Sequence, residues 1–174
     1  MANTYVAIQT VTVGSGGSST IVFTSIPATY TDLQLLLSLR TTGVGGSTGS
    51  IGQITFNSST SGYSEYDVYG QQGSVGSGGY SPITTYIPTG RDDNANQTAN
   101  TFSSCSVYIP NYTSANFKSV SLDSASENNS TNASMAFIAG LWSNTAAINA
   151  ITITSGDGNY VEYSSATLYG IKNS

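Results

Sequence analysis

The chain has 174 residues and a formal net charge of −5, with no histidine, one cysteine, four Lys or Arg and nine Asp or Glu. Histidine is the side chain best suited to proton transfer and metal binding near neutral pH, so its absence argues against an enzyme and against a bound cofactor or metal. The scattered basic residues do not form the cluster that a nucleic-acid backbone requires. No apolar run approaches the ~20 residues of a membrane span. The composition therefore favours a structural or binding protein.

Short apolar segments alternate with Gly-, Ser-, Asn- and Thr-rich segments along the chain. This spacing is typical of an all-β sandwich or barrel, and no segment has a sustained helical period. We predict one antiparallel, jelly-roll-like β-sandwich domain over residues 1–174, with a single helical turn at 144–148 as its helical candidate. In chain order, the predicted strands are 4–13, 19–26, 32–39, 51–56, 63–69, 83–87, 102–109, 116–122, 134–141, 148–154, 160–163 and 166–171.

The predicted strand 32–39 carries the densest apolar pattern. Leu33, Leu35, Leu37 and Leu39 share one face, and Leu36 lies on the other. Strands that are apolar on both faces are usually buried on both. We therefore expect this strand to be central in its sheet and covered on both sides.

Polar, glycine-rich composition predicts three long loops, at 41–50, 70–82 and 89–100. Long loops are uncommon in compact domains unless they are functional or mobile. The third contains Asp92, Asp93 and Asn94, whose oxygen atoms suit a hard cation. Their spacing does not follow a calcium-loop pattern, so we interpret them as a polar turn beside Arg91 and leave cation binding open.

Two further groups of residues are candidates for catalysis, but a structural role is the better interpretation of each. Asp123 and Glu127 form a carboxylate pair, but glycoside hydrolysis needs two acids on either side of a bond, and these two share one Asn- and Ser-rich segment. Cys105 cannot form an internal disulfide and has no histidine to activate it, so we expect it to be a small buried hydrophobe. Trp142 follows Ile138 and Leu141 and is expected in the core or an interface.

Tyrosine is the most ambiguous signal of the sequence. Tyr is common at interfaces because it combines a large area, few torsions and a hydroxyl group. Stacking on sugar rings and ordinary strand packing are equally physical uses. We predict an interface from a cluster of five tyrosines: Tyr63, Tyr66, Tyr69, Tyr80 and Tyr86.

Several short segments together resemble a group of small virion proteins of bacteriophages, common in phages of marine and freshwater bacteria. The resemblance covers nearly the whole chain, and it departs at Ser143, where the group often has Arg. The segments are Ser25-Ile26-Pro27 with Tyr30-Thr31-Asp32-Leu33, Phe56-Asn57 with Gly62-Tyr63-Ser64, Asn111-Tyr112-Thr113 with Phe117-Lys118, Gly140-Leu141-Trp142 with Ala147-Ile148, and Thr167–Ile171.

The resemblance implies a non-enzymatic structural protein located in the virion. We expect a capsid decoration or cement protein that contacts the major capsid protein or other virion proteins through neutral, Tyr-rich surfaces. A sandwich with so few charges has little to protect its strand edges, so we also expect a homo-oligomer, with a trimer favoured. The alternative is a tail-fibre or head-fibre tip that binds a host cell-surface glycan. A glycan-active enzyme is the third hypothesis.

Overall fold

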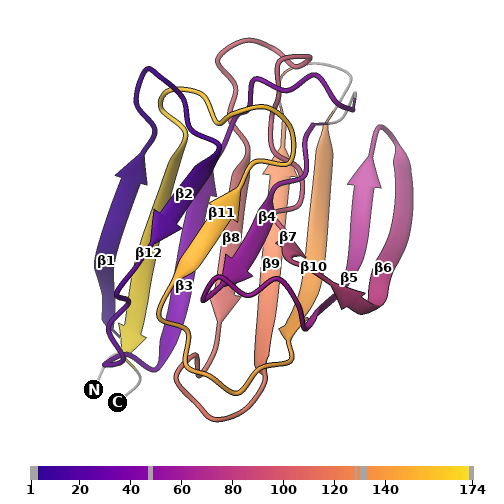
Figure 1. Cartoon of the computed structure of the whole chain (residues 1–174). Helices are drawn as coiled ribbons and strands as arrows, with labels where there is room; N and C mark the ends of the chain where they lie inside the picture. The colour runs from indigo at the N-terminus through magenta and orange to yellow at the C-terminus, as the bar shows by residue number, and fades with distance from the viewer. Residues whose placement is uncertain (1–3, 47–48, 128, 130–132, 173–174) are drawn as a thin grey trace.

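Two antiparallel sheets pack face to face in the computed structural model (Figure 1). It describes residues 4–46, 49–127, 129 and 133–172, apart from the side chains of 80–84, and these ranges contain no helix. The large sheet has the order β1 (Thr4–Thr12), β12 (Ser165–Lys172), β3 (Asp32–Ser38), β8 (Ser104–Ile109), β9 (Lys118–Ser126), β10 (Ser134–Trp142), β5 (Tyr63–Gln71) and β6 (Ser74–Thr84). The small sheet has the order β2 (Thr20–Phe23), β11 (Ile151–Thr154), β4 (Gln53–Phe56) and β7 (Ile87–Pro88).

Strict alternation of inward and outward side chains builds the core between the sheets. Every second residue of β9, from Lys118 to Ser126, is buried, and its neighbours are exposed. This period of two is the geometry of a strand with one covered face. The inward side chains form one cluster, which includes Leu35, Val107 and Leu122 from the large sheet and Phe23, Ile54 and Ile153 from the small one.

The chain passes repeatedly from one sheet to the other, which is how β1, β2 and β3 come to alternate between layers. All pairings between neighbouring strands are antiparallel. The predicted all-β, jelly-roll-like sandwich is therefore confirmed. Within the described residues, no helix is long and apolar enough to cross a membrane.

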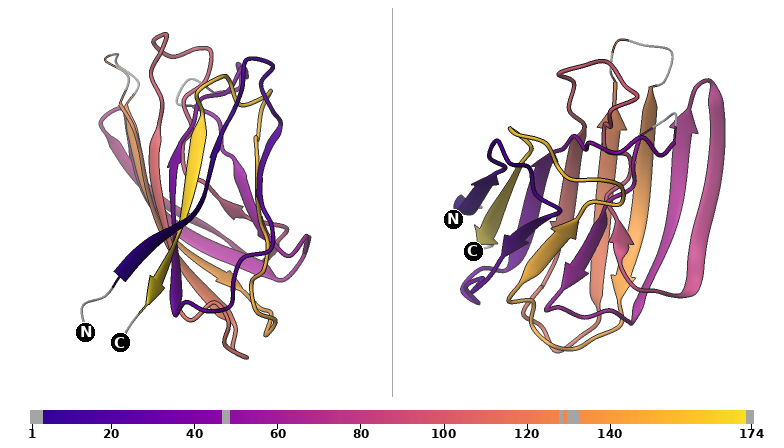
Figure 2. Two further views of the ribbon diagram at one scale, coloured as in Figure 1. Left: turned by 90° about the vertical axis from the view of Figure 1, so that its left-hand side faces the viewer. Right: turned by 45° about the horizontal axis from the view of Figure 1, so that its top comes forward.

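The two sheets differ in width, and this difference shapes the molecule. The small sheet ends at β7, whereas the large sheet continues from β10 through β5 to β6 (Figure 1). In the second view of Figure 2, β5 and β6 extend past the small sheet. We call β10, β5 and β6 the overhanging end of the large sheet. β12, β3, β8 and β9 are the covered part, and β1 is the edge strand at the other side.

Four predicted elements are wrong. The predicted strand 83–87 is divided, with 83–84 at the end of β6, 85–86 in a bend and 87 at the start of β7. The segment 70–82 was expected to be a loop, but most of it forms β6, which pairs with β5. A turn at Gln72 and Gly73, with φ of 49° and 79°, joins the two strands, and positive φ at both positions is the mark of a hairpin turn. Residues 160–163 form a bridge and turn rather than a strand, and 144–148 is not helical.

The prediction for 32–39 is correct in one respect and wrong in another. β3 is central, between β12 and β8. Its outer face is not covered, however, because the small sheet packs on the other face, and the Leu36 side chain is 43% exposed. A single apolar residue on an outer face is thus no evidence of a second covering layer.

Candidate functional site

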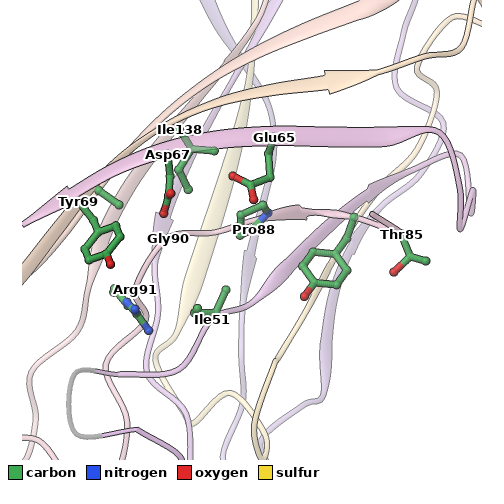
Figure 3. Close-up of a pocket in the computed structure, with 11 residues that line it drawn as sticks. Ile51, Glu65, Asp67, Tyr69, Thr85, Pro88, Gly90, Arg91 and Ile138 are labelled. Atoms are coloured by element: carbon green, nitrogen blue, oxygen red, sulfur yellow. The ribbon is translucent and has the colours of Figure 1, made fainter. Parts of the chain in front are cut away.

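A cavity of about 420 Å³ lies under the inner face of the overhanging end (Figure 3). Strand alternation places Glu65, Asp67 and Tyr69 of β5 along one of its walls. β10 adds Ala136 and Ile138 to the same wall. The cavity lies where the small sheet ends at β7 while the large sheet continues through β5 to β6.

The opposite wall comes from β7, from the residues on either side of it, and from a residue just before β4. It includes Tyr86, Pro88, Gly90 and Arg91, with Ile51 beside them. In Figure 3, Arg91 and Ile51 face the row formed by Glu65, Asp67 and Tyr69. The cavity thus combines an apolar surface, two tyrosines, two carboxylates and one guanidinium group.

The outer face of the same strands is apolar. Five large side chains on it are between 50% and 83% exposed: Tyr66 and Val68 of β5, Val75 of β6, and Met135 and Phe137 of β10. Register makes them neighbours, since Phe137 lies opposite Val68 and Met135 opposite Gly70, which in turn lies opposite Val75. We call these five residues the outer patch.

The five predicted interface tyrosines separate into different environments. Tyr66 belongs to the outer patch, whereas Tyr69 and Tyr86 line the cavity. The side chain of Tyr80 lies outside the described residues. The prediction for Tyr63 needs correction, because its side chain is fully buried and offers no surface to a partner.

Tyr63 is held in the core by both its ring and its hydroxyl group. The ring stacks on Trp142 at a centroid distance of 6.1 Å, and Phe56 lies 5.6 Å from Trp142. The backbone N–H of Phe56 donates to the Tyr63 hydroxyl oxygen at 2.7 Å. Burial raises the pKa of this hydroxyl. The expectation that Trp142 is a core residue is confirmed, with 1% of it exposed.

Lys118, another residue of the resemblance, also has a structural position. Its side chain is 1% exposed, and its Nζ donates to the carbonyl oxygens of Ser114 at 2.7 Å and Asn144 at 3.4 Å. Burial lowers the pKa of this amine. Lys118 and Trp142 lie opposite each other across β9 and β10. Both side chains are buried, so they stabilise the fold and offer no surface to a partner.

The segment 89–100 contains turns, as expected, but the residues interpreted as a polar turn beside Arg91 belong to a buried polar network. Asp92, Asp93 and Asn94 are fully buried. The Thr89 hydroxyl donates to Asp92 Oδ2 at 3.1 Å, and the Ser126 hydroxyl donates to Asp93 Oδ1. Burial raises the pKa of Asp92 to about 7. No group of three His, Cys, Asp or Glu with metal-binding geometry occurs in the part of the chain that the structure describes.

Arg40 ties this segment to the sandwich. Its guanidinium group donates to the carbonyl oxygens of Thr98 at 2.8 Å, Thr101 at 3.0 Å and Gln97 at 3.1 Å. Backbone bonds add to this, because Thr41 N–H donates to the Asp93 carbonyl at 2.8 Å. The network is consistent with a folding role, since buried polar groups need such partners.

The remaining candidates do not form a site. Asp123 is exposed on the outer face of β9, and Glu127 is exposed beyond the end of that strand, so neither reaches the cavity. Cys105 is buried in β8, as expected, and burial raises the pKa of its thiol. The sequence reasoning missed Glu65 and Asp67. Their alternate spacing within a predicted strand was the signal that both would share one face.

Comparison of the chain with protein-family models, curated proteins and solved structures found no match. The resemblance to phage virion proteins therefore stays a prediction. The arguments about function that follow come from the fold, the outer patch and the cavity.

Proposed function

We propose that the chain is a non-enzymatic structural protein of a bacteriophage particle, a decoration or cement protein that docks on the capsid through the outer patch. The observation that carries this proposal is the apolar character of the patch. Soluble monomers rarely expose contiguous apolar surfaces of more than a few hundred Å² unless they bind something there. Tyr, Phe and Met, three of its residue types, are enriched in protein interfaces.

The patch follows the outer surface of three adjacent strands, and its five residues are uncharged, with Asp123 of β9 opposite Phe137 at its border. We propose that its partner is a largely neutral surface of the major capsid protein or another shell protein. An interface of this kind depends little on salt, because ionic screening acts on charges. Through Val75 the patch includes part of β6, an edge strand with no charged residue.

Unprotected edge strands favour association with a further chain. β1, the edge at the other side of the large sheet, also lacks charged residues. We therefore include homo-oligomerisation in the proposal, with a trimer as the favoured assembly on a shell with local symmetry axes.

The test compares two exposed apolar residues on the same outer face. Phe137→Ser alters the patch, and Leu36→Ser is the matched control on the covered part, where the side chain is 43% exposed. Purified variants are mixed with capsids of the phage that carries this chain, and bound protein is measured by sedimentation at low and high salt. We expect Phe137→Ser to weaken binding by about tenfold or more, as for a residue that contributes ~1.4 kcal/mol, and Leu36→Ser to bind as the unaltered protein does.

Light scattering of the free proteins reports self-association in the same samples. Equal binding by both variants would contradict docking through the patch. An unaltered protein that binds neither capsids nor itself would contradict the structural role as a whole.

A further inference from the structure

We propose that the cavity at the overhanging end binds a neutral saccharide unit. Its volume of about 420 Å³ falls within the range of roughly 300–1,000 Å³ for small-molecule sites. This inference goes beyond the docking role and does not depend on it, because the cavity and the outer patch lie on opposite faces of β5 and β10.

The alternation of β5 separates the two functions residue by residue. Glu65, Asp67 and Tyr69 line the cavity, whereas Tyr66 and Val68 between them are exposed on the outer face. A protein docked through the outer patch would keep the cavity on the far side of the sheet from its partner. The same strand thus offers one face to a shell and the other to a ligand.

The lining suits the two kinds of surface on a sugar ring. Ile138, Pro88 and the ring of Tyr69 provide apolar area for the C–H faces. Carboxylates accept hydroxyl hydrogens at several lone pairs, and hydrogen bonds to a charged acceptor are stronger than those between neutral groups. Glu65 and Asp67 supply these acceptors.

Arg91 supplies the complementary donors, since its guanidinium group has five N–H groups and no acceptor. Glu65 is 7% exposed and projects from a strand that is paired on both sides. Burial restricts the rotamers of this side chain, which reduces the entropy cost of binding.

Other ligand classes fit the lining less well. Anionic sugars and phosphates would meet two carboxylates against one guanidinium group, and like charges at short range are unfavourable. A purely apolar ligand would remove water from the carboxylates without replacing their hydrogen bonds. A neutral, hydroxyl-rich ring satisfies both the apolar and the polar parts of the cavity.

The test is a titration of the full chain with glucose, galactose, mannose and N-acetylglucosamine and with their disaccharides. Binding is measured by NMR and by calorimetry. Glucuronic acid is the anionic probe and putrescine the cationic probe. We expect saturable, millimolar binding of at least one neutral sugar and binding of glucuronic acid that is weaker by about tenfold or more. Absence of saturable binding by every neutral sugar, or a preference for glucuronic acid or putrescine, would overturn the proposal.

Three single variants locate the binding. Tyr69→Ala and Asp67→Asn are expected to weaken the affinity by about tenfold each, whereas Tyr66→Ala, on the opposite face of the same strand, leaves it unchanged. Thermal unfolding checks that each variant is folded, and Asp67→Asn preserves the shape of its side chain if Tyr69→Ala is unstable. Equal affinities of the Tyr69, Asp67 and Tyr66 variants would place the site elsewhere and overturn the assignment.

Discussion

The covered part and the overhanging end of the large sheet follow the same strand alternation but place it in different surroundings. In the covered part, inward residues such as Leu35 and Leu122 pack on the small sheet and are fully buried. At the overhanging end, the inward residues Glu65 and Asp67 line a cavity, and outward residues such as Phe137 are apolar and exposed. Both parts contribute to the core, since Tyr63 and Trp142 of the overhanging end are buried as well. The two parts differ along the cavity and on the outer face, where the overhanging end carries the outer patch.

Two neighbouring strands show this difference most directly. β9 presents Ser119, Ser121 and Asp123 to the outside, whereas β10, paired with it, presents Met135 and Phe137. Folding requires the inward residues of both strands but does not require apolar residues on the outside of β10. We attribute the change from polar to apolar at this boundary to the docking contact proposed for the outer patch.

The largest expected effect comes from the core. Trp142→Ala removes a fully buried ring that stacks on Tyr63 and packs against Phe56, and we expect a loss of about 3–5 kcal/mol of unfolding free energy. Phe137→Ala, on the exposed face of the same strand, should change it by no more than about 0.5 kcal/mol. Urea unfolding of both variants measures the difference. Similar losses for the two would remove the distinction between the faces of β10.

A pH effect comes next and concerns the buried network around Asp92. Burial raises the pKa of Asp92 to about 7, above the value of ~3.9 in an unfolded chain. Between these values the folded state holds a proton that the unfolded state has released, so unfolding free energy falls as pH rises through this window. We expect a loss of at most about 4 kcal/mol by pH ~7.

Asp92→Asn removes the titrating group and isolates its contribution. Unfolding free energies of this variant, measured across the same pH window, should be nearly flat where those of the unaltered protein fall. Parallel pH profiles for the two proteins would show that Asp92 titrates normally.

The smallest effects compare two glycines with positive φ. Gly73, with φ of 79°, lies in the turn of the overhanging hairpin, and no atom lies near an added Cβ. Gly73→Ala should therefore lower the unfolding free energy only by the cost of a left-handed backbone for alanine, about 1 kcal/mol. At Gly90, with φ of 88°, an added Cβ would collide with the Ser124 side chain in the buried network. Gly90→Ala should therefore cost more than Gly73→Ala in chemical denaturation. The reverse order would mean that the hairpin, and not the network, carries the stability.

Periodicity was sufficient to predict most strands, because alternation reports which face is covered. It failed where the alternation is weak. β6 has the composition of a loop, since its glycines carry no side chain to show a face, and only its pairing with β5 makes it a strand. Leu36 led to the wrong prediction that both faces of β3 are covered. A single apolar residue can lie on an exposed face without a layer packed on it.

The candidate site was less accessible to sequence reasoning than the fold. The Tyr cluster was found, but its described side chains lie in three places: Tyr63 in the core, Tyr66 on the outer patch, and Tyr69 and Tyr86 in the cavity. Sequence spacing alone does not assign Tyr63 to the core. The cavity depends on where the small sheet ends relative to the large one. That relation arises from the packing of β7 against its neighbours, which no local pattern encodes.

Oxidative footprinting of side chains in intact particles and in the free protein tests the central claim, that the outer patch is a docking surface. Tyr66, Met135 and Phe137 are 58%, 63% and 59% exposed in the isolated chain, and Phe117 and Tyr163, at 57% and 70%, lie away from the patch. We expect the three patch residues to be protected in the particle while Phe117 and Tyr163 react as in the free protein. Protection of Phe117 and Tyr163 with full reactivity of the patch would contradict the claim.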